Sequence, residues 1–414
     1  MKNNFLFKSI SILAFIVLIS SCDLLKNNNE TKPSDEYLLS YDMKTTYLPS
    51  IIKPILEQQI SSKYPDFQPV LDQMKHNVSV YTITYLTTFK DEQVIASGLV
   101  AVPTTSGIQF PIMSFQNGTN TLHSMAPSVN PDDELYLMLE FVASTGFIIS
   151  LPDYLGFGES DQMFHPYLDK ESTVQTVIDM LHAVKELVNN YLYIDMSNDL
   201  YITGYSQGGW ATMQLQKAIE TGYSSEFNLK ASACAAGPYD LNFINSYVLG
   251  QTTYPMPYFL GYVFNSYINL GYITNPASDV FNSPYDNVVT TYYDGTHSGE
   301  DINAHLTTSV ADLFTDDYRN NATTDGKFAS IINSMSENSI SAWNTVTPML
   351  ILHGTDDDFV PQQVSQNIYQ DFLTLGVSPD KVIYVPLAGE THTSGAIPAE
   401  LASIKWFLDL KNAE

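Results

Sequence analysis

Apolar and polar positions follow two different rhythms in most of the chain after residue 76. Short runs rich in β-branched and aromatic residues alternate with longer runs in which apolar residues recur every three or four positions. The first pattern is typical of strands and the second of amphipathic helices. Strands are expected at residues 78–89, 93–102, 110–116, 147–151, 200–203, 229–236, 347–353 and 381–385. Helices are expected at residues 134–145, 173–188, 208–221, 361–375 and 396–410.

The order of these segments predicts the fold class. The first two strands are joined by Lys90, Asp91 and Glu92 and are expected to form a hairpin. Farther along, strands and helices alternate, an order that produces a mostly parallel sheet with helices on both faces. In such sheets the loops at the carboxyl ends of the strands build the functional site. We therefore expect an α/β fold around a mostly parallel central sheet.

Two segments depart from the alternation. Residues 238–345 are rich in Tyr, Asn, Ser and Phe and contain few clear strands, so we expect an inserted, mainly helical cap. Residues 36–76 carry short amphipathic pieces broken by prolines, which predicts a helical flank. The α/β domain should then consist of residues 77–237 and 346–414.

The first residues, MKNNFLFKSISILAFIVLISSC, combine two lysines, an apolar run and two serines before a cysteine. The apolar run is shorter than the roughly 20 residues of a membrane-spanning helix, which disfavours an uncleaved anchor. These features predict a bacterial lipoprotein signal at residues 1–21, cleaved before Cys22, with a lipid on the cysteine thiol. The polar residues 22–35 would form a tether. We therefore expect a bacterial cell-envelope protein, held in the outer membrane by its lipid.

Charge and cysteine content narrow the picture a little further. The net charge of −27 opposes binding to a phosphate backbone, so nucleic acid is not an expected partner. With Cys22 committed to lipid, Cys234 has no disulfide partner and is expected in the core. The sequence Gly156-Phe157-Gly158 lacks the third glycine of a dinucleotide loop, and no phosphate-binding P-loop motif occurs. No cofactor is expected.

The motif with the clearest chemistry is Gly204-Tyr205-Ser206-Gln207-Gly208, between an expected strand and an expected helix. A serine on such a sharp strand-to-helix turn projects its hydroxyl above the sheet. Glycines two residues to either side avoid clashes with the neighbouring strand and helix. A Gly-rich structural turn is the alternative, but the flanking elements favour a nucleophilic Ser206.

A nucleophilic serine needs a base, which in folds of this kind comes late in the chain. Four histidines follow Ser206. His297 and His305 lie within the expected cap, and His353 ends a strand before a glycine, where it is expected to support the turn. His392 lies in the loop LAGETHTSG after the last expected strand and is the candidate base, the alternative being an exposed loop histidine.

The segment HGTDDDFVP resembles the acid loop of α/β hydrolases, which often reads H-G-x-x-D-x-x-V-P. The resemblance places Asp357 at the position of the acid. Asp356 and Asp358 are then expected to be turn residues. A metal site is disfavoured because neither a calcium-loop spacing nor an H-E-x-x-H helix accompanies the triplet.

The resemblance extends to LPDYLGFGESD at residues 151–161 and to FNLKASACAAGPYDL. Among α/β hydrolases the chain is most similar to the secretory lipase family over residues 80–411. That family has a helical cap after the sixth strand, which corresponds to residues 238–345. It implies an oxyanion hole made by the backbone N–H of Gln207 and an N–H of Asn117 or Gly118. Unlike the usual members, the chain has no cysteine pair.

Aromatic residues crowd the segment YPMPYFLGYVFNSY in the expected cap. They could line an apolar acyl or aryl pocket or hold the cap to the rest of the protein. His123 and His165 are expected to be solvated loop histidines near the mouth of the pocket. The aromatic residues are Tyr254, Tyr258, Phe259, Tyr262, Phe264 and Tyr267.

Three classes of function are compatible with these observations. A carboxylic ester hydrolase acting on small-molecule or lipid esters leads, because nucleophile, acid, base and oxyanion loop occur in the required order. A serine peptidase of the prolyl oligopeptidase type is second, although residues 23–77 leave no room for its usual propeller domain. The third is an envelope lipoprotein that binds ligands on an inactive hydrolase scaffold.

Overall fold

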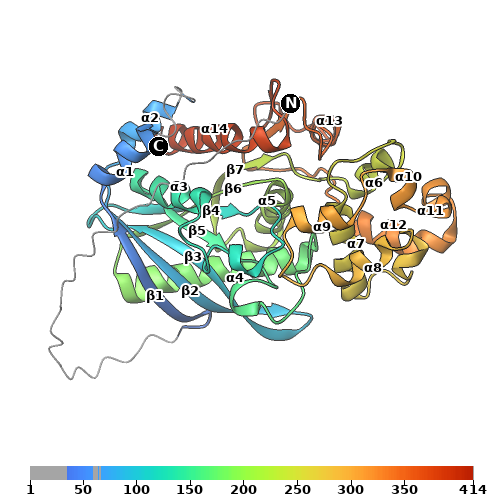
Figure 1. Cartoon of the computed structure of the whole chain (residues 1–414). Coiled ribbons are helices and arrows are strands. Elements are labelled where there is room, and N and C mark those ends of the chain that lie inside the picture. Colours follow the sequence, from blue (N-terminus) through green and yellow to red (C-terminus); the bar gives the residue numbers. More distant parts are fainter. Residues whose placement is uncertain (1–34, 59–63, 65–66, 414) are drawn as a thin grey trace. The chain divides into compact units, whose positions relative to one another are not determined.

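A computed structural model describes residues 35–58, 64 and 67–413 (Figure 1). The expected signal at residues 1–21, the lipidation site Cys22 and nearly all of the expected tether lie outside the described residues. Within the described part, no helix is long and apolar enough to cross a membrane.

The centre of the fold is a nine-stranded sheet with strand order β1-β2-β3-β5-β4-β6-β7-β8-β9. The pairs β1–β2, β2–β3 and β3–β5 are antiparallel, and all other neighbours are parallel. This arrangement confirms the α/β fold with a mostly parallel sheet. The strands are β1 (Leu38–Tyr47), β2 (Val78–Phe89), β3 (Glu92–Pro103), β4 (Phe110–Gln116), β5 (Ile148–Pro152), β6 (Met196–Tyr205), β7 (Asn228–Ala235), β8 (Met349–Gly354) and β9 (Val382–Leu387).

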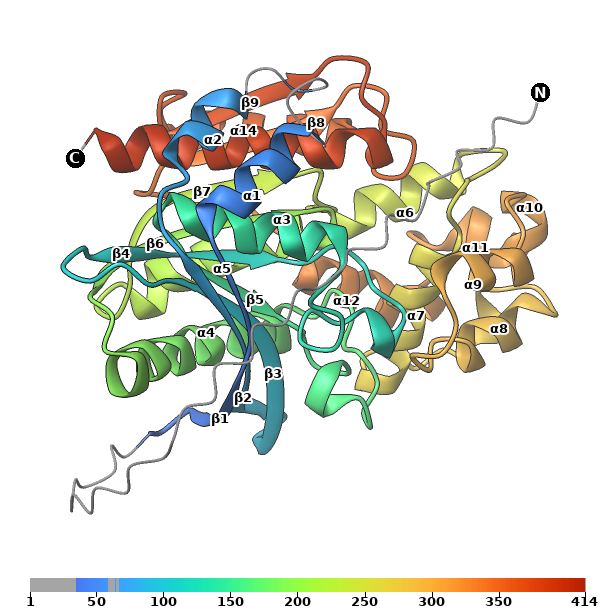
Figure 2. The same ribbon diagram turned by 60° about the vertical axis from the view of Figure 1, so that its left-hand side comes forward.

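Helices cover both faces of the sheet because each carries an apolar stripe that packs on it (Figure 2). One face is covered by α1 (Pro49–Leu56), α2 (Gln68–Gln73), α3 (Glu134–Val142) and α14 (His392–Asn412). The other is covered by α4 (Lys170–Glu186) and α5 (Gln207–Ala218). The helix α13 (Gln363–Thr374) connects β8 to β9.

The prediction of a helical flank at residues 36–76 is wrong in its first third. Strand β1 lies there, at the edge of the sheet, and only Leu38 of its residues is buried. An edge strand that is open to solvent alternates weakly, so its apolar signal is faint. The helices α1 and α2 follow as expected. Because of the additional strand, the cap follows the seventh strand of the chain rather than the sixth.

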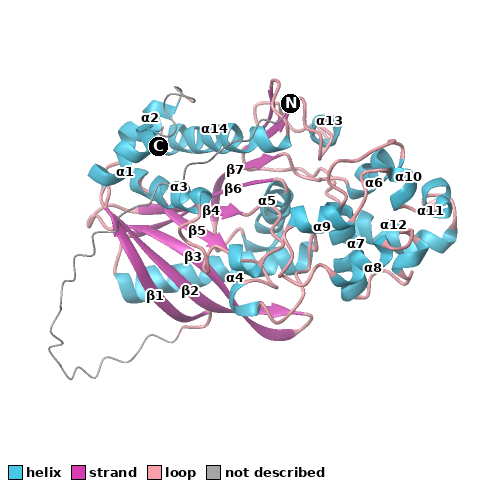
Figure 3. Ribbon diagram, viewed as in Figure 1, coloured by secondary structure: helices cyan, strands magenta, loops and turns pink. Residues whose placement is uncertain are grey.

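Between β7 and β8 the chain forms a group of helices, drawn in yellow and orange in Figure 1. No strand of the central sheet lies in this segment (Figure 3). We call residues 238–345 the cap. Stacked and edge-on aromatic pairs hold it together, for example Phe264 with Phe281 and with Tyr318. Its helices are α6 (Leu241–Leu249), α7 (Tyr258–Leu270), α8 (Tyr285–Thr291), α9 (Gly299–His305), α10 (Val310–Leu313), α11 (Asp316–Asn321) and α12 (Ala329–Asn338).

Candidate active site

Ser206 occupies the turn between β6 and α5 with φ 60° and ψ −121°, a strained conformation for a residue with a side chain. The positions around it must be glycine because there is no room for a side chain. A Cβ on Gly204 would lie 2.5 Å from the carbonyl oxygen of Gly208, and a Cβ on Gly208 would lie 1.9 Å from that of Gln116. A Cβ on Gly209 would lie 2.1 Å from the carbonyl oxygen of Ala235. The turn therefore fits closely between β4 and β7.

The structure brings Ser206, His392 and Asp357 into one hydrogen-bonded chain. His392 Nε2 lies 2.9 Å from Ser206 Oγ, and His392 Nδ1 lies 2.7 Å from Asp357 Oδ2. Since a carboxylate only accepts, Nδ1 carries a proton and Nε2 of the neutral ring accepts from the serine hydroxyl. The three residues come from the β6–α5 turn, the start of α14 and the loop after β8.

His392 is not in a loop as predicted, because it is the first residue of α14. Thr391 caps this helix: its side chain accepts from the N–H of Ser394, and the Ser394 hydroxyl accepts from the N–H of Thr391. The helix begins four positions before the expected residue 396, and Pro398, inside it, obscured its start in the sequence. The carbonyl oxygen of His392 also accepts a hydrogen bond of 2.6 Å from the Tyr205 hydroxyl. The imidazole is thus held by a rigid element.

The side chain of Asp357 is buried, whereas its neighbours Asp356 and Asp358 are exposed. Its Oδ1 accepts from the N–H groups of Phe359 and Val360, at 3.0 and 2.8 Å. Burial opposes its charge, but hydrogen bonds from two histidines outweigh that effect and hold the pKa of Asp357 well below its ordinary value. The carboxylate is therefore charged and oriented. Among the described residues, no group of three or more His, Cys, Asp and Glu is arranged to hold a metal ion.

The second histidine on Asp357 is His353, which the sequence interpretation assigned only to the turn. Its Nε2 lies 2.9 Å from the carbonyl oxygen of Val360 and 3.1 Å from Asp357 Oδ2. Its Nδ1 lies 2.6 Å from the hydroxyl of Ser365. His353 is fully buried and spans the acid loop, so it both supports the turn and contacts the acid. In the sequence, the contact could have been suspected from the short spacing, because His353 lies four residues before Asp357.

The loop after β4 contains Asn117 and Gly118. The side chain of Asn117 donates to the carbonyl oxygen of Pro152 at 2.7 Å, and the backbone carbonyl oxygen of Asn117 accepts from the Tyr154 hydroxyl at 3.3 Å. These bonds fix the loop to the end of β5 and to the residues that follow it. Gln207 is the first residue of α5, where backbone N–H groups have no acceptor within the helix.

His165 is not solvated as predicted, but buried against the elbow, the turn between β6 and α5 that carries Ser206. Its Nδ1 donates to the carbonyl oxygen of Leu155 at 2.7 Å, and its Nε2 accepts from the Gln207 side-chain amide at 3.0 Å. Burial lowers the pKa of His165 to about 4, so the ring is neutral at neutral pH. His123 lies instead against the cap, with its Nε2 3.0 Å from the carbonyl oxygen of Asp294.

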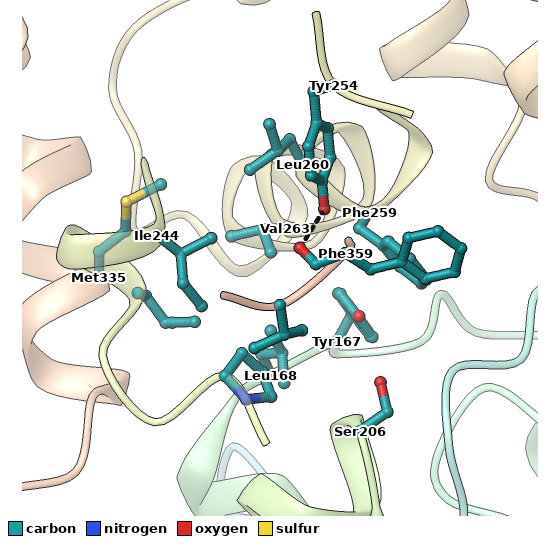
Figure 4. A pocket seen from close by; sticks show the side chains of 13 residues that line it. Tyr167, Leu168, Ser206, Ile244, Tyr254, Phe259, Leu260, Val263, Met335 and Phe359 are labelled. Carbon is teal, nitrogen blue, oxygen red and sulfur yellow. Dashed lines mark hydrogen bonds between the residues drawn. The ribbon is translucent and has the colours of Figure 1, made fainter. Parts of the chain in front are cut away.

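A small apolar cavity of about 40 Å³ opens at Ser206, whose hydroxyl points towards it (Figure 4). Ser206 forms its base and cap helices form much of its wall. The lining residues are Tyr167, Leu168, Ser206, Pro238, Leu241, Ile244, Tyr254, Phe259, Leu260, Val263, Met335, Phe359 and Val360. We call this cavity the apolar pocket.

The cap aromatics divide between the two roles that the sequence left open. Tyr254 and Phe259 line the apolar pocket. Phe264 and Tyr267 are fully buried and pack within the core that the cap shares with α5 and α13. Tyr254 also joins the cap to the acid loop, because its hydroxyl donates to the carbonyl oxygen of Phe359 at 3.0 Å.

Comparison with family models finds a match to part of the chain. The model of the prolyl oligopeptidase family matches residues 134–224, which include the elbow but neither Asp357 nor His392. No curated protein matches the chain.

Similar solved structures span nearly the whole chain. A Legionella pneumophila protein has a TM-score of 0.79 and 25% identity, covering 92% of this chain and 99% of its own. The rice cell wall degrading esterase LipA from Xanthomonas oryzae has a TM-score of 0.75 and 25% identity, covering 92% and 98%. Candida antarctica lipase A, at 16% identity over 90% and 81%, shares the fold with a TM-score of 0.62. The chain is therefore an α/β hydrolase with structural similarity to esterases and lipases.

Proposed function

We propose that the protein is a serine hydrolase that cleaves carboxylic esters through an acyl-enzyme. The observation that carries the proposal is the hydrogen-bonded chain from Ser206 through His392 to Asp357, with the serine hydroxyl at the base of the apolar pocket. A nucleophile, a base and an orienting acid in this order are the components of acyl transfer.

In the proposed first step, the Ser206 oxygen attacks the ester carbonyl while His392 Nε2 takes the hydroxyl proton. The imidazolium that forms is stabilised by the charged carboxylate of Asp357. His392 then gives its proton to the departing alkoxide, which leaves as the alcohol. A water molecule attacks the acyl-enzyme with His392 again as the base, and the acid leaves as Ser206 regains its proton.

The developing oxyanion requires donors beside Ser206. We propose the backbone N–H of Gln207, at the start of α5, together with that of Asn117 or Gly118. The tight contact of Gly208 with the carbonyl groups of Gln116 and Asn117 supports this assignment, because it keeps the loop against the helix terminus. One such donor is typically worth about 100- to 1,000-fold in turnover.

The experiment compares the purified protein with Ser206→Ala on p-nitrophenyl esters from acetyl to palmitoyl. We expect hydrolysis by the wild type and a loss of about 10⁵- to 10⁶-fold in kcat in the variant. A serine-directed organophosphonate should label the wild type at Ser206 only. Absence of both hydrolysis and labelling in folded wild-type protein would reject the proposal and favour a binding lipoprotein on an inactive scaffold.

A serine peptidase is the second candidate, and the match of residues 134–224 to the prolyl oligopeptidase family favours it. The same serine, histidine and aspartate would cleave an amide. We expect proline-containing peptide p-nitroanilides to be cleaved far more slowly than esters. A higher kcat/KM on the peptides than on every ester would reverse the order of the two candidates.

We also propose that the mature protein is anchored to the bacterial envelope through a lipid on Cys22. The proposal rests on the sequence of the first 22 residues. Metabolic labelling with palmitate in a bacterial host should mark the wild type and not Cys22→Ala. An unlabelled wild-type protein would contradict the lipid anchor and leave the proposed hydrolysis untouched.

A further inference from the structure

The apolar pocket is closed on the side away from Ser206. In Figure 4, Met335 and Ile244 lie at the far end from the serine, while Leu260 and Val263 form the wall contributed by α7. All four side chains are buried. A group attached to a carbonyl at Ser206 would therefore run into these side chains rather than into solvent.

The cavity is small as well as apolar. About 40 Å³ of it is open to the centre of a sphere the size of a water molecule, which in a compact shape is about 4 Å across. Neighbouring carbon atoms of an extended chain advance by roughly 1.3 Å, because a C–C bond is about 1.52 Å long. The space therefore takes the centres of about three or four acyl carbons, counted from the carbonyl carbon bonded to Ser206.

The end of the pocket is also held in place. Helices α6 and α12, which carry Ile244 and Met335, are joined by hydrogen bonds from Asn242 Nδ2 to the Ile332 carbonyl oxygen at 3.1 Å and to Ser336 Oγ at 2.7 Å. On the opposite wall, the hydrogen bond from Tyr254 to Phe359 ties the cap to the acid loop. Extending the pocket would require these contacts to break.

We propose that the protein is selective for esters of short apolar acids, propionyl and butyryl in particular, and that Met335 with Ile244 sets the length limit. This proposal rests on the proposed ester hydrolysis at Ser206. In this proposal the cap limits the length of the acyl group that the site accepts.

The test measures kcat/KM of the full-length protein on p-nitrophenyl acetate, propionate, butyrate, hexanoate and octanoate. We expect a maximum at propionate or butyrate and a fall of about 100-fold from butyrate to octanoate. A maximum at hexanoate or octanoate, or an even profile, would overturn the length limit while leaving ester hydrolysis established. If no ester is cleaved and the organophosphonate does not label Ser206, it is the proposed function that fails.

Two substitutions test the residues assigned to the limit. Met335→Ala removes the γ-methylene, sulfur and methyl group at the closed end and should raise the octanoate-to-butyrate ratio of kcat/KM about tenfold. Ile244→Phe fills the same end and should lower the butyrate-to-acetate ratio about tenfold. Ratios are used because they are independent of the fraction of active enzyme.

The matched control is Met74→Ala, which truncates an equally buried methionine in the apolar cluster under α1, α2 and α14, away from the pocket. It should leave both ratios unchanged even if it lowers thermal stability. Folding of each variant is checked by circular dichroism. Unchanged ratios in folded Met335→Ala and Ile244→Phe would overturn their assignment as the limit.

Discussion

The sheet with the helices that cover it, here called the sheet region, meets the cap at Ser206. The two regions are built from different interactions. Around the elbow, positions are fixed by backbone contacts: glycines that pack against carbonyl groups, a capped helix start and a carboxylate held by two histidines. The cap instead packs aromatic and aliphatic side chains, and it presents mainly such side chains to the pocket. We therefore expect the proposed chemistry to depend on exact backbone placement, and the proposed selection of the acyl group to depend on side-chain volume.

The largest loss of activity is expected from a change at the acid, Asp357. Asp357→Asn should lower kcat about 10⁴-fold, because the amide no longer fixes the tautomer of His392 or stabilises its charged form. The exposed neighbour Asp356 provides a matched control, and Asp356→Asn should keep nearly full activity. Steady-state kinetics on a p-nitrophenyl ester measures both. Equal losses in the two variants would contradict the assignment of Asp357.

The next effect concerns the tolerance of each region for a single methyl group. Gly208→Ala would place a Cβ 1.9 Å from the carbonyl oxygen of Gln116 and should cost roughly 3 kcal/mol of unfolding free energy, with loss of activity. Gly326, in the cap, has no atom within 4 Å of an added Cβ. Gly326→Ala should therefore be neutral within about 0.5 kcal/mol. Urea unfolding compares the two, and similar costs would remove the proposed difference between the regions.

A pH dependence of stability should reveal a buried carboxyl group between the sheet and α14. The Glu400 side chain on α14 is buried, its Oε2 accepts from Thr203 Oγ1 at 3.3 Å, and burial raises its pKa to about 8. Between the ordinary pKa of 4.5 and about 8, the folded protein retains a proton that the unfolded chain has released, so stability falls as the pH rises through this window.

Glu400→Gln removes this titration. Relative to the wild type, the variant should gain on the order of 4 kcal/mol of unfolding free energy between pH 5 and pH 9. Denaturant unfolding at the two pH values provides the measurement. Glu140, whose pKa burial also raises to about 8, is present in both proteins and cancels. A constant difference between the two proteins at both pH values would refute the effect of the buried Glu400 carboxyl group.

The smallest expected effect is at the hydrogen bond that joins the two regions. Tyr254→Phe leaves the ring in the pocket but removes the donor to the carbonyl oxygen of Phe359, which should cost about 1 kcal/mol. We expect KM to rise several-fold with little change in kcat, because the triad itself keeps its contacts. A large fall in kcat with KM unchanged would mean that the cap helps to position Asp357.

The sequence predicted the sheet region well because its signals are local. The glycines around Ser206 and the short apolar strands reflect steric requirements that leave a residue pattern. Strand β1 escaped prediction because it is an edge strand open to solvent, so its apolar pattern is weak. The contact of His165 with Gln207 escaped because the two residues are 42 positions apart and only the fold brings them together. The wall of the apolar pocket is assembled from separate cap helices, so no single segment could have revealed its length.

The position of strand β1 at the edge of the sheet determines how the fold would respond to a pulling force. The backbone N–H groups of Glu36 and Leu38 donate to the Glu186 carboxylate at 2.8 and 2.6 Å, which clamps the start of the fold to α4. Tension applied at the N-terminal end of the folded part would load this clamp and the β1–β2 ladder first. Four strands separate β1 from β6, which ends at the nucleophile turn. An enzyme pulled by its N-terminus could thus yield at its edge while Ser206, His392 and Asp357 keep their alignment.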